Sequence, residues 1–217
     1  MVIKISKYLL LLGTVYLIAC SSPDDVAYIE KTKKDSVKAV TAQENNATKT
    51  YDQLVEKPGV VGVFDVPEML TICRKDSAKA EDMASAFAKN YAMLEADLKY
   101  LGMKSDGAAG SIYYNNDPSN FIFECVYPIS EIPKKKPKDS QIVALEASHM
   151  LIYNYFGDYR NLYKAYDEIK HHISENNLEQ SGPLREFYIT DPIKVKDTAK
   201  WMTRIMVPVM AKKKKNS

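Results

Sequence analysis

Two stretches of the chain carry the same order of hydrophobic and polar positions. Residues 123–129 read Phe-Glu-Cys-Val-Tyr-Pro-Ile, and residues 203–209 read Thr-Arg-Ile-Met-Val-Pro-Val, so the pattern returns after eighty residues (124 to 204). Each stretch follows a turn with an Asp-Pro pair, Asp117-Pro118 or Asp191-Pro192. Both have the β-branched composition of a strand. The sequence therefore predicts one structural unit that is encoded twice.

Upstream of each strand, the hydrophobic spacing changes to the 3.6-residue period of an amphipathic helix. Ahead of each helical pattern lies an apolar run of strand composition, Val60 to Cys73 in the first copy and Ile142 to Tyr155 in the second. Each unit is therefore predicted to be strand, helix, strand, strand. The helical positions are Met83, Phe87, Leu94, Leu98 and Leu101 in the first copy, and Leu162, Tyr166, Ile169 and Ile173 in the second.

These elements predict an α+β fold in which both units contribute to one antiparallel sheet with two helices on one face. Residues 58–210 are enough for one domain, with the first copy at 58–132 and the second at 139–210. The two copies would be related by a pseudo-two-fold axis. We expect a binding site in the cleft where they meet.

The chain begins with a secretory pattern. Residues 1–19 contain Lys4 and Lys7 followed by an apolar run too short to span a bilayer comfortably, which is typical of a signal peptide. The run ends in Leu-Ile-Ala-Cys at Cys20, which resembles a bacterial lipobox, whose cysteine is acylated (for example with palmitate) on its sulfur and amino group. The alternative is an ordinary cleaved signal. Ser21 rather than Asp follows the cysteine, which resembles lipoproteins sent to the outer membrane. The lipoprotein hypothesis therefore places the protein in the cell envelope, anchored in the outer membrane on its periplasmic or surface face, an address that depends on the organism.

The polar stretch at 20–57 has the composition of a flexible tether, and 211–217 is a basic tail. The whole chain has 30 basic and 28 acidic residues, and a near-neutral protein is not expected to bind nucleic acid. Two local lysine runs, 134–138 and 212–215, would either touch anionic lipid or simply be solvated.

Neither a metal site nor a cofactor site is predicted. His171 and His172 are adjacent and would point roughly 100° apart on a helix, which is not ligand spacing. In an oxidising envelope Cys73 and Cys125 would form a disulfide or remain as two buried thiols, and the sequence leaves both options open.

The second copy resembles the GyrI-like effector-binding domains. The resemblance is carried by residues 156–163 (Phe-Gly-Asp-Tyr-Arg-Asn-Leu-Tyr), 182–192 (Gly-Pro-Leu-Arg-Glu-Phe-Tyr-Ile-Thr-Asp-Pro) and 207–209 (Val-Pro-Val). It extends over roughly residues 60 to 210, and the first copy matches more loosely. It implies a pocket between the two halves, lined with aromatic side chains, in which a buried glutamate recognises cationic or lipophilic ligands.

Carried over by position, the resemblance assigns a pocket glutamate to Glu124 and borders the pocket with Tyr114, Tyr188 and Tyr159. The equivalent position in the second copy holds Arg204 instead of a glutamate. If Arg204 faces Glu124 across the cleft, the pair cancels the field that attracts cations, and the ligand would be neutral, zwitterionic or anionic. A closed pocket is the remaining alternative.

Three functions follow from these features. The first is an extracytoplasmic, membrane-anchored lipoprotein whose domain binds a small amphipathic or lipophilic molecule. The second is a hydrolase of reactive small molecules that uses Glu124 as its base. The third is a docking or structural lipoprotein with a closed cleft.

Overall fold

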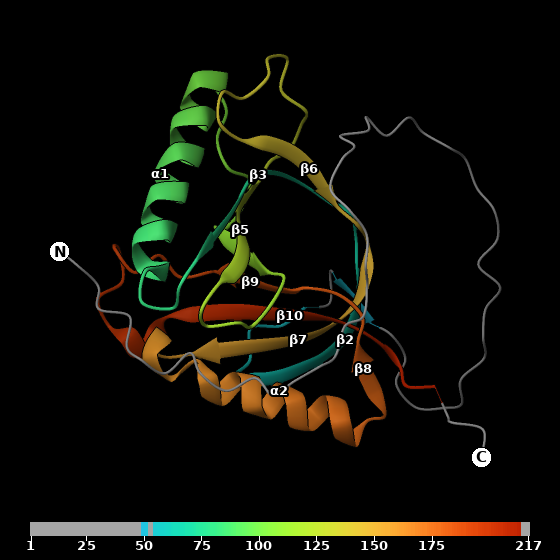
Figure 1. Ribbon diagram of the computed structural model, residues 1–217. Coiled ribbons are helices and arrows are strands. Elements are labelled where there is room, and N and C mark those ends of the chain that lie inside the picture. Colours follow the sequence, from blue (N-terminus) through green and yellow to red (C-terminus); the bar gives the residue numbers. More distant parts are fainter. Residues whose placement is uncertain (1–48, 52–53, 214–217) are drawn as a thin grey trace, which may run out of the picture. The chain divides into compact units, whose positions relative to one another are not determined.

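The computed structural model describes residues 49–51 and 54–213, coloured by sequence in Figure 1. The predicted signal peptide, the predicted lipidation site Cys20 and most of the predicted tether lie outside the described residues. A search of the described helices finds none with the length and apolar character needed to span a membrane.

The described chain alternates strands with two long helices. The first copy contains β2 (Gly59–Val66), β3 (Met69–Ala78), α1 (Met83–Leu101), β4 (Gly110–Tyr113) and β5 (Phe121–Pro128), preceded by the short β1 (Lys49–Thr50). The second copy contains β6 (Gln141–Leu145), β7 (Ser148–Phe156), α2 (Tyr163–Glu175), β9 (Leu184–Tyr188) and β10 (Met202–Ala211). Three shorter elements complete the second copy, namely the 3-10 helices η2 (Tyr159–Asn161) and η3 (Thr198–Lys200) and the strand β8 (Leu178–Gln180).

The strands form one sheet in the order β1-β2-β7-β10-β9-β4-β5-β3-β6, and β8 pairs separately with β10. All pairs are antiparallel except β1 with β2. At the centre, β4 of the first copy pairs with β9 of the second, and Ser111 lies opposite Glu186. The α+β prediction with an antiparallel sheet is confirmed.

The first strand of each copy is bent rather than continuous, which differs from the sequence prediction. The run from Val60 to Cys73 breaks after Val66, where Pro67 has no N–H to donate to a ladder. The second run breaks between Leu145 and Ser148. The two bent strands stay paired on both sides of their breaks, β2 with β7 and β3 with β6. As a result, each half of the sheet ends in a strand that belongs to the other copy.

Both helices lie on the same face of the sheet, as predicted. One row of partnered residues crosses five strands: Cys125, Ser111, Glu186, Ile205 and Tyr153. α1 buries Leu94 and Leu98 in the cluster that contains Cys125, and α2 buries Ala165 and Ile169 in the cluster that contains Ile205 and Tyr153. In Figure 1 the central strand β9 runs between the regions covered by the two helices.

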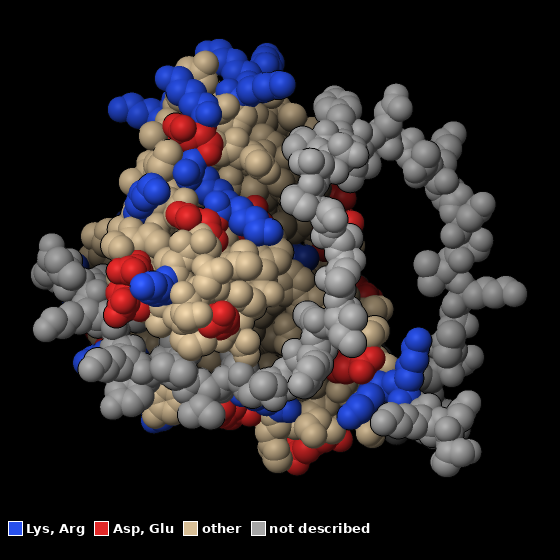
Figure 2. Space-filling view, viewed as in Figure 1, with Lys and Arg blue, Asp and Glu red and all other residues tan. Residues whose placement is uncertain are grey.

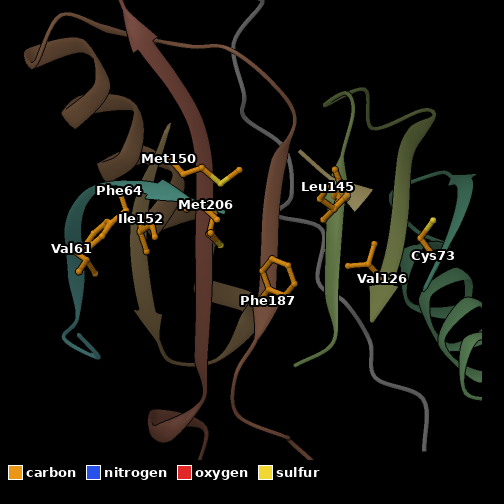
Figure 3. Packing of buried hydrophobic residues seen from close by; sticks show 11 residues of the cluster. Val61, Phe64, Cys73, Val126, Leu145, Met150, Ile152, Phe187 and Met206 are labelled. Atoms are coloured by element: carbon orange, nitrogen blue, oxygen red, sulfur yellow. The ribbon is translucent and has the colours of Figure 1, made fainter. Parts of the chain in front are cut away.

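The opposite face of the sheet carries the third hydrophobic cluster, shown in Figure 3. It joins Phe64 on β2, near one end of the strand order, with Cys73 on β3 and Leu145 on β6 at the other end, so the sheet curves strongly around this face. Cys73 and Cys125 are both buried free thiols. They lie on opposite faces of the sheet, Cys73 in this cluster and Cys125 under α1, which rules out a disulfide between them.

The last residues of the predicted tether are part of the domain. Tyr51 and Leu54 pack against the cluster of the curved face. The buried Asn154 donates hydrogen bonds from its Nδ2 to the carbonyls of Val55 (3.0 Å) and Lys57 (3.2 Å). All strands and all three clusters use residues between 49 and 211, so this segment contains a complete hydrophobic core.

Candidate functional site: a buried glutamate under tyrosines

A carboxylate lies at the centre of the helix-covered face. Glu186 on β9 is only 1% exposed. Its oxygens accept hydrogen bonds from the hydroxyls of Tyr113 (3.3 Å), Tyr188 (3.2 Å) and Tyr166, the last of these from α2. Burial raises the pKa of Glu186 above its ordinary value, and the three tyrosine hydrogen bonds act in the opposite direction. Among the described residues, no ion pair involves Glu186.

The pseudo-two-fold axis passes beside this glutamate. Ser111 pairs with Cys125 and Glu186 pairs with Ile205, which are equivalent positions of the repeat, so Ser111 and Glu186 are equivalent in the two copies and also lie opposite each other. The α1 residue Tyr91 donates to the carbonyl of Gly110 (2.7 Å) and lies 3.0 Å from the Ser111 hydroxyl, as Tyr166 of α2 does for Glu186. The site is therefore symmetric in its tyrosines and asymmetric in its charge.

A layer of aromatic rings covers Glu186 between the two helices. The ring of Tyr188 lies 5.8 Å from that of Tyr159, which lies 5.0 Å from that of Trp201. On the other side Phe87 of α1 meets Tyr113 edge-on at 6.4 Å. All of these residues are half-buried, whereas Glu186 below them is fully buried. We call this set the aromatic layer: Phe87, Tyr91, Tyr113, Tyr159, Tyr166, Tyr188 and Trp201.

The tyrosines of the layer act as donors, not as charges. Burial, followed by the charge of Glu186, raises the pKa of Tyr113 and Tyr166 well above the ordinary tyrosine value. Their hydroxyls therefore stay protonated at neutral pH and can donate to the carboxylate. An ionised carboxylate without a cation is costly to bury, and aromatic faces attract cations. This arrangement favours a positively charged, lipophilic ligand that displaces one or more rings.

Glu124, the glutamate selected from the sequence, lies on the opposite face of the sheet. It is buried and accepts a 2.7 Å hydrogen bond from the hydroxyl of Tyr114. The Lys75 ammonium lies 4.2 Å from the centre of the Tyr114 ring, and Lys75 is the strand partner of Glu124. This glutamate therefore has a neighbouring cation and a hydroxyl donor from the protein itself.

Arg204 does not pair with Glu124, so the predicted ion pair is wrong. Its Nε donates to Oδ1 of Asn154 at 3.1 Å. β10 and β5 are separated by β9 and β4, so the two residues are three strand spacings apart, roughly 14 Å at about 4.8 Å each. Glu124 and Arg204 are nevertheless equivalent in the two copies. Glu124 pairs with Ile112 and Arg204 pairs with Phe187, and these two partners occupy equivalent positions on β4 and β9. Residues related by a pseudo-two-fold axis need not meet at it.

The predicted tyrosines divide between the two faces. Tyr188 and Tyr159 belong to the aromatic layer. Tyr114 contacts Glu124 on the other face, and the true equivalent of Tyr188 is Tyr113, one residue earlier than the sequence alignment placed it. A shift of one residue along a strand moves a side chain to the opposite face.

The sequence analysis did not identify Glu186, although it lies within residues 182–192, which carry the family resemblance. Strand alternation places Glu186 and Tyr188 on one face and Arg185 and Phe187 on the other. The signal that could have found it is a carboxylate in a short strand that shares its face with a tyrosine. Among the described residues no group of acidic, histidine or cysteine side chains could hold a metal ion.

Comparisons with known proteins identify a matching family. The family model of the GyrI-like small molecule binding domain matches residues 68–210. No curated protein sequence gives a significant match.

Three solved structures show the same fold at low identity. The EcmrR–DNA complex in EcmrR-RPo has a TM-score of 0.61 at 19% identity, over 69% of this chain and 56% of its own. A hydrolase encoded by lin2189 from Listeria innocua gives 0.53 at 12%, over 76% and 100%. SAV2435 bound to tetraphenylphosphonium gives 0.50 at 15%, over 68% and 92%. This chain therefore spans little more than half of the EcmrR chain.

Proposed function

Because the chain belongs to the GyrI-like small molecule binding domain family, we propose that it binds a lipophilic cation over Glu186 and within the aromatic layer. The observation that carries the proposal is the carboxylate of Glu186, which is 1% exposed and has tyrosine hydroxyls rather than cations as its partners. SAV2435, which has the same fold, binds tetraphenylphosphonium, a cation of this class.

Ligand entry requires ring movement, because Tyr113, Tyr166 and Tyr188 surround the carboxylate in this structure. Tyr159 is the best candidate to move. It lies on the three-residue 3-10 helix η2, between β7 and α2, and is held by ring contacts to Tyr188 and Trp201. Displacing Tyr159 would uncover Tyr188 while the sheet stays intact.

Hydrolysis is the second candidate, and one observation favours it. A glutamate whose pKa is raised by burial, beside tyrosine hydroxyls, is suited to general acid or base chemistry. In this candidate the general base is Glu186 and not Glu124, the residue selected from the sequence. Turnover of chromogenic esters or epoxides that is lost in Glu186→Gln would favour the enzyme over the binding protein.

The cellular setting is proposed from the sequence. The lipobox-like Cys20 would anchor the protein in the outer membrane, and the polar stretch after it would hold the domain near that surface. Metabolic labelling with a palmitate analogue tests this, because label incorporated into the wild type should be absent from Cys20→Ser.

Binding is tested by thermal shift on residues 49–217 with tetraphenylphosphonium, a neutral aromatic compound and an aromatic anion. A ligand at about one hundred times its Kd adds roughly 2.7 kcal/mol, or about 5–10 °C for a domain of this size. We expect a shift with the cation alone, and its loss in Glu186→Gln.

Glu124→Gln is the matched control, since it removes the same charge from the opposite face of the sheet. It should keep the shift. Loss of the shift in Glu124→Gln with retention in Glu186→Gln would move the site to the face that the sequence suggested. No shift with any of the three probes would count against binding of this ligand class.

A further inference from the structure

The C-terminal end of α1 and the β5–β6 connection form a strongly basic projection. Four lysines lie within five residues of the connection, Lys134, Lys135, Lys136 and Lys138, all exposed. Lys99 and Lys104 flank the end of α1. Figure 2 shows these Lys side chains gathered at the top of the molecule, above the end of α1. We call this region the lysine tip.

The connection is held in a defined position against α1. The buried Asp97 of α1 accepts hydrogen bonds from the backbone N–H of Lys138 and of Asp139, both at 3.0 Å. Arg74 on β3 donates to the carbonyl of Asp139. Pro133 and Pro137 border the lysines and restrict the backbone further. The lysines are therefore presented by an ordered element.

Two lysines also contact an aromatic ring at the tip. The ammonium groups of Lys138 and Lys135 lie 4.3 Å and 5.5 Å from the centre of the Tyr100 ring, which is 42% exposed. These contacts hold the like charges close together at a cost in mutual repulsion, which an anionic partner would relieve. In the sequence, the acidic residues that flank the run are Glu131 and Asp139, one at each end, and the nearby Asp97 carboxylate is occupied by two backbone N–H groups.

An exposed apolar side chain completes the surface. Ile132 is 73% exposed and comes two residues before the first lysine of the run. A soluble polyanion would interact favourably with the lysines only. A bilayer with anionic headgroups would interact favourably with the lysines and also with an isoleucine that enters the interface.

We propose that the lysine tip is a docking surface for an anionic lipid bilayer, with Ile132 inserted among the headgroups. The proposal is independent of the ligand site, because the tip lies at the end of α1 and Glu186 at the centre of the sheet. If Cys20 anchors the chain, the tip would also fix the orientation of the domain on the same membrane.

Co-sedimentation of residues 49–217 with vesicles tests the proposal. One set of vesicles contains phosphatidylcholine and phosphatidylglycerol, and the other phosphatidylcholine alone. We expect binding to the first set only. Each lysine near an anionic surface contributes about fivefold in partitioning, so neutralising four lysines should weaken binding by roughly several hundredfold.

Two variants carry the same loss of charge. The first changes Lys134, Lys135, Lys136 and Lys138 to Gln. The control changes four exposed lysines elsewhere to Gln, namely Lys57, Lys79, Lys164 and Lys196. Circular dichroism confirms that each is folded. Equal binding by the two variants would overturn the proposal, because net charge and not the tip would then be responsible.

Ile132→Ser separates a bilayer from other polyanions. It should weaken binding to the anionic vesicles by roughly tenfold, since the apolar side chain no longer enters the interface. It should leave binding to heparin unchanged. If Ile132→Ser has no effect on vesicle binding while the tip lysines control heparin binding, the surface serves a soluble polyanion and the lipid proposal fails.

Discussion

Replacing Glu186 with glutamine tests whether this carboxylate controls ligand charge. The substitution keeps the size of the side chain and its ability to accept hydrogen bonds from the tyrosines, but removes the charge. A cation about 5 Å from the carboxylate, at an effective dielectric constant of about 20, gains about 3.3 kcal/mol. Glu186→Gln should therefore weaken binding of tetraphenylphosphonium by about two hundredfold or more.

The pH dependence gives a second, independent signature. Because burial raises the pKa of Glu186, the folded protein retains this proton at pH values where the unfolded chain has lost it. The stability from this group is complete below the ordinary glutamate pKa, about 4.3, and is lost as the pH rises through the raised value. Within that window the unfolding free energy of the unliganded protein should fall by up to about 1.4 kcal/mol per pH unit relative to Glu186→Gln.

Urea titrations at a series of pH values measure the unfolding free energy, and isothermal titration calorimetry measures the affinity for the cation and its pH dependence. Below the raised pKa, a cation must displace the proton of Glu186, so its affinity should rise by up to tenfold per pH unit and then level off. Titrations in buffers of different ionisation enthalpy should show proton release for the wild type and for Glu124→Gln. An affinity that is independent of pH, together with full binding by Glu186→Gln, would refute the reasoning.

Three further predictions concern the two faces of the sheet. Asn154→Leu should lower the unfolding free energy by about 3 kcal/mol in urea titrations, because three hydrogen-bonding groups on β10 and the N-terminal segment lose their buried partner. Tyr166→Phe should cost about 1–2 kcal/mol in the same assay, since Glu186 loses a donor. Cys73 and Cys125 should stay unreactive towards a thiol reagent until the protein unfolds, because both are buried and burial raises the pKa of Cys125 to about 12.

Local patterns in the sequence predicted most of the fold. The spacing of Leu94 and Leu98, and of Ile169 in the second copy, identified helix faces that are buried in the structure. The repeated Pro-containing strands located β5 and β10 at the correct residues. The bend at Pro67 was missed although the sequence carries its signal, because a proline inside an apolar run cannot donate to the ladder and marks a strand break.

The site was harder to predict because it depends on strand register. The repeat correctly identified Glu124 and Arg204 as equivalent residues of the two copies. It could not show how far each of them lies from the pseudo-two-fold axis, and therefore whether they meet. Only the pairing of β4 with β9 shows that Ser111 and Glu186 are central. The alignment that joined Tyr114 to Tyr188 was one residue from the correct register, which was enough to confuse the two faces of the sheet.

The two copies exchange their edge strands, so each half of the sheet depends on a strand from the other copy. β2 of the first copy completes the half formed by β7, β10 and β9, and β6 of the second completes the half formed by β4, β5 and β3. Neither copy alone could cover its own edge, so a chain with one copy would have to exchange that strand with a second molecule. The arrangement is that of a strand-swapped dimer whose two subunits have been joined into one polypeptide. Because both copies lie in one chain, the position that holds Ser111 in the first copy can hold Glu186 in the second, which two identical subunits could not do.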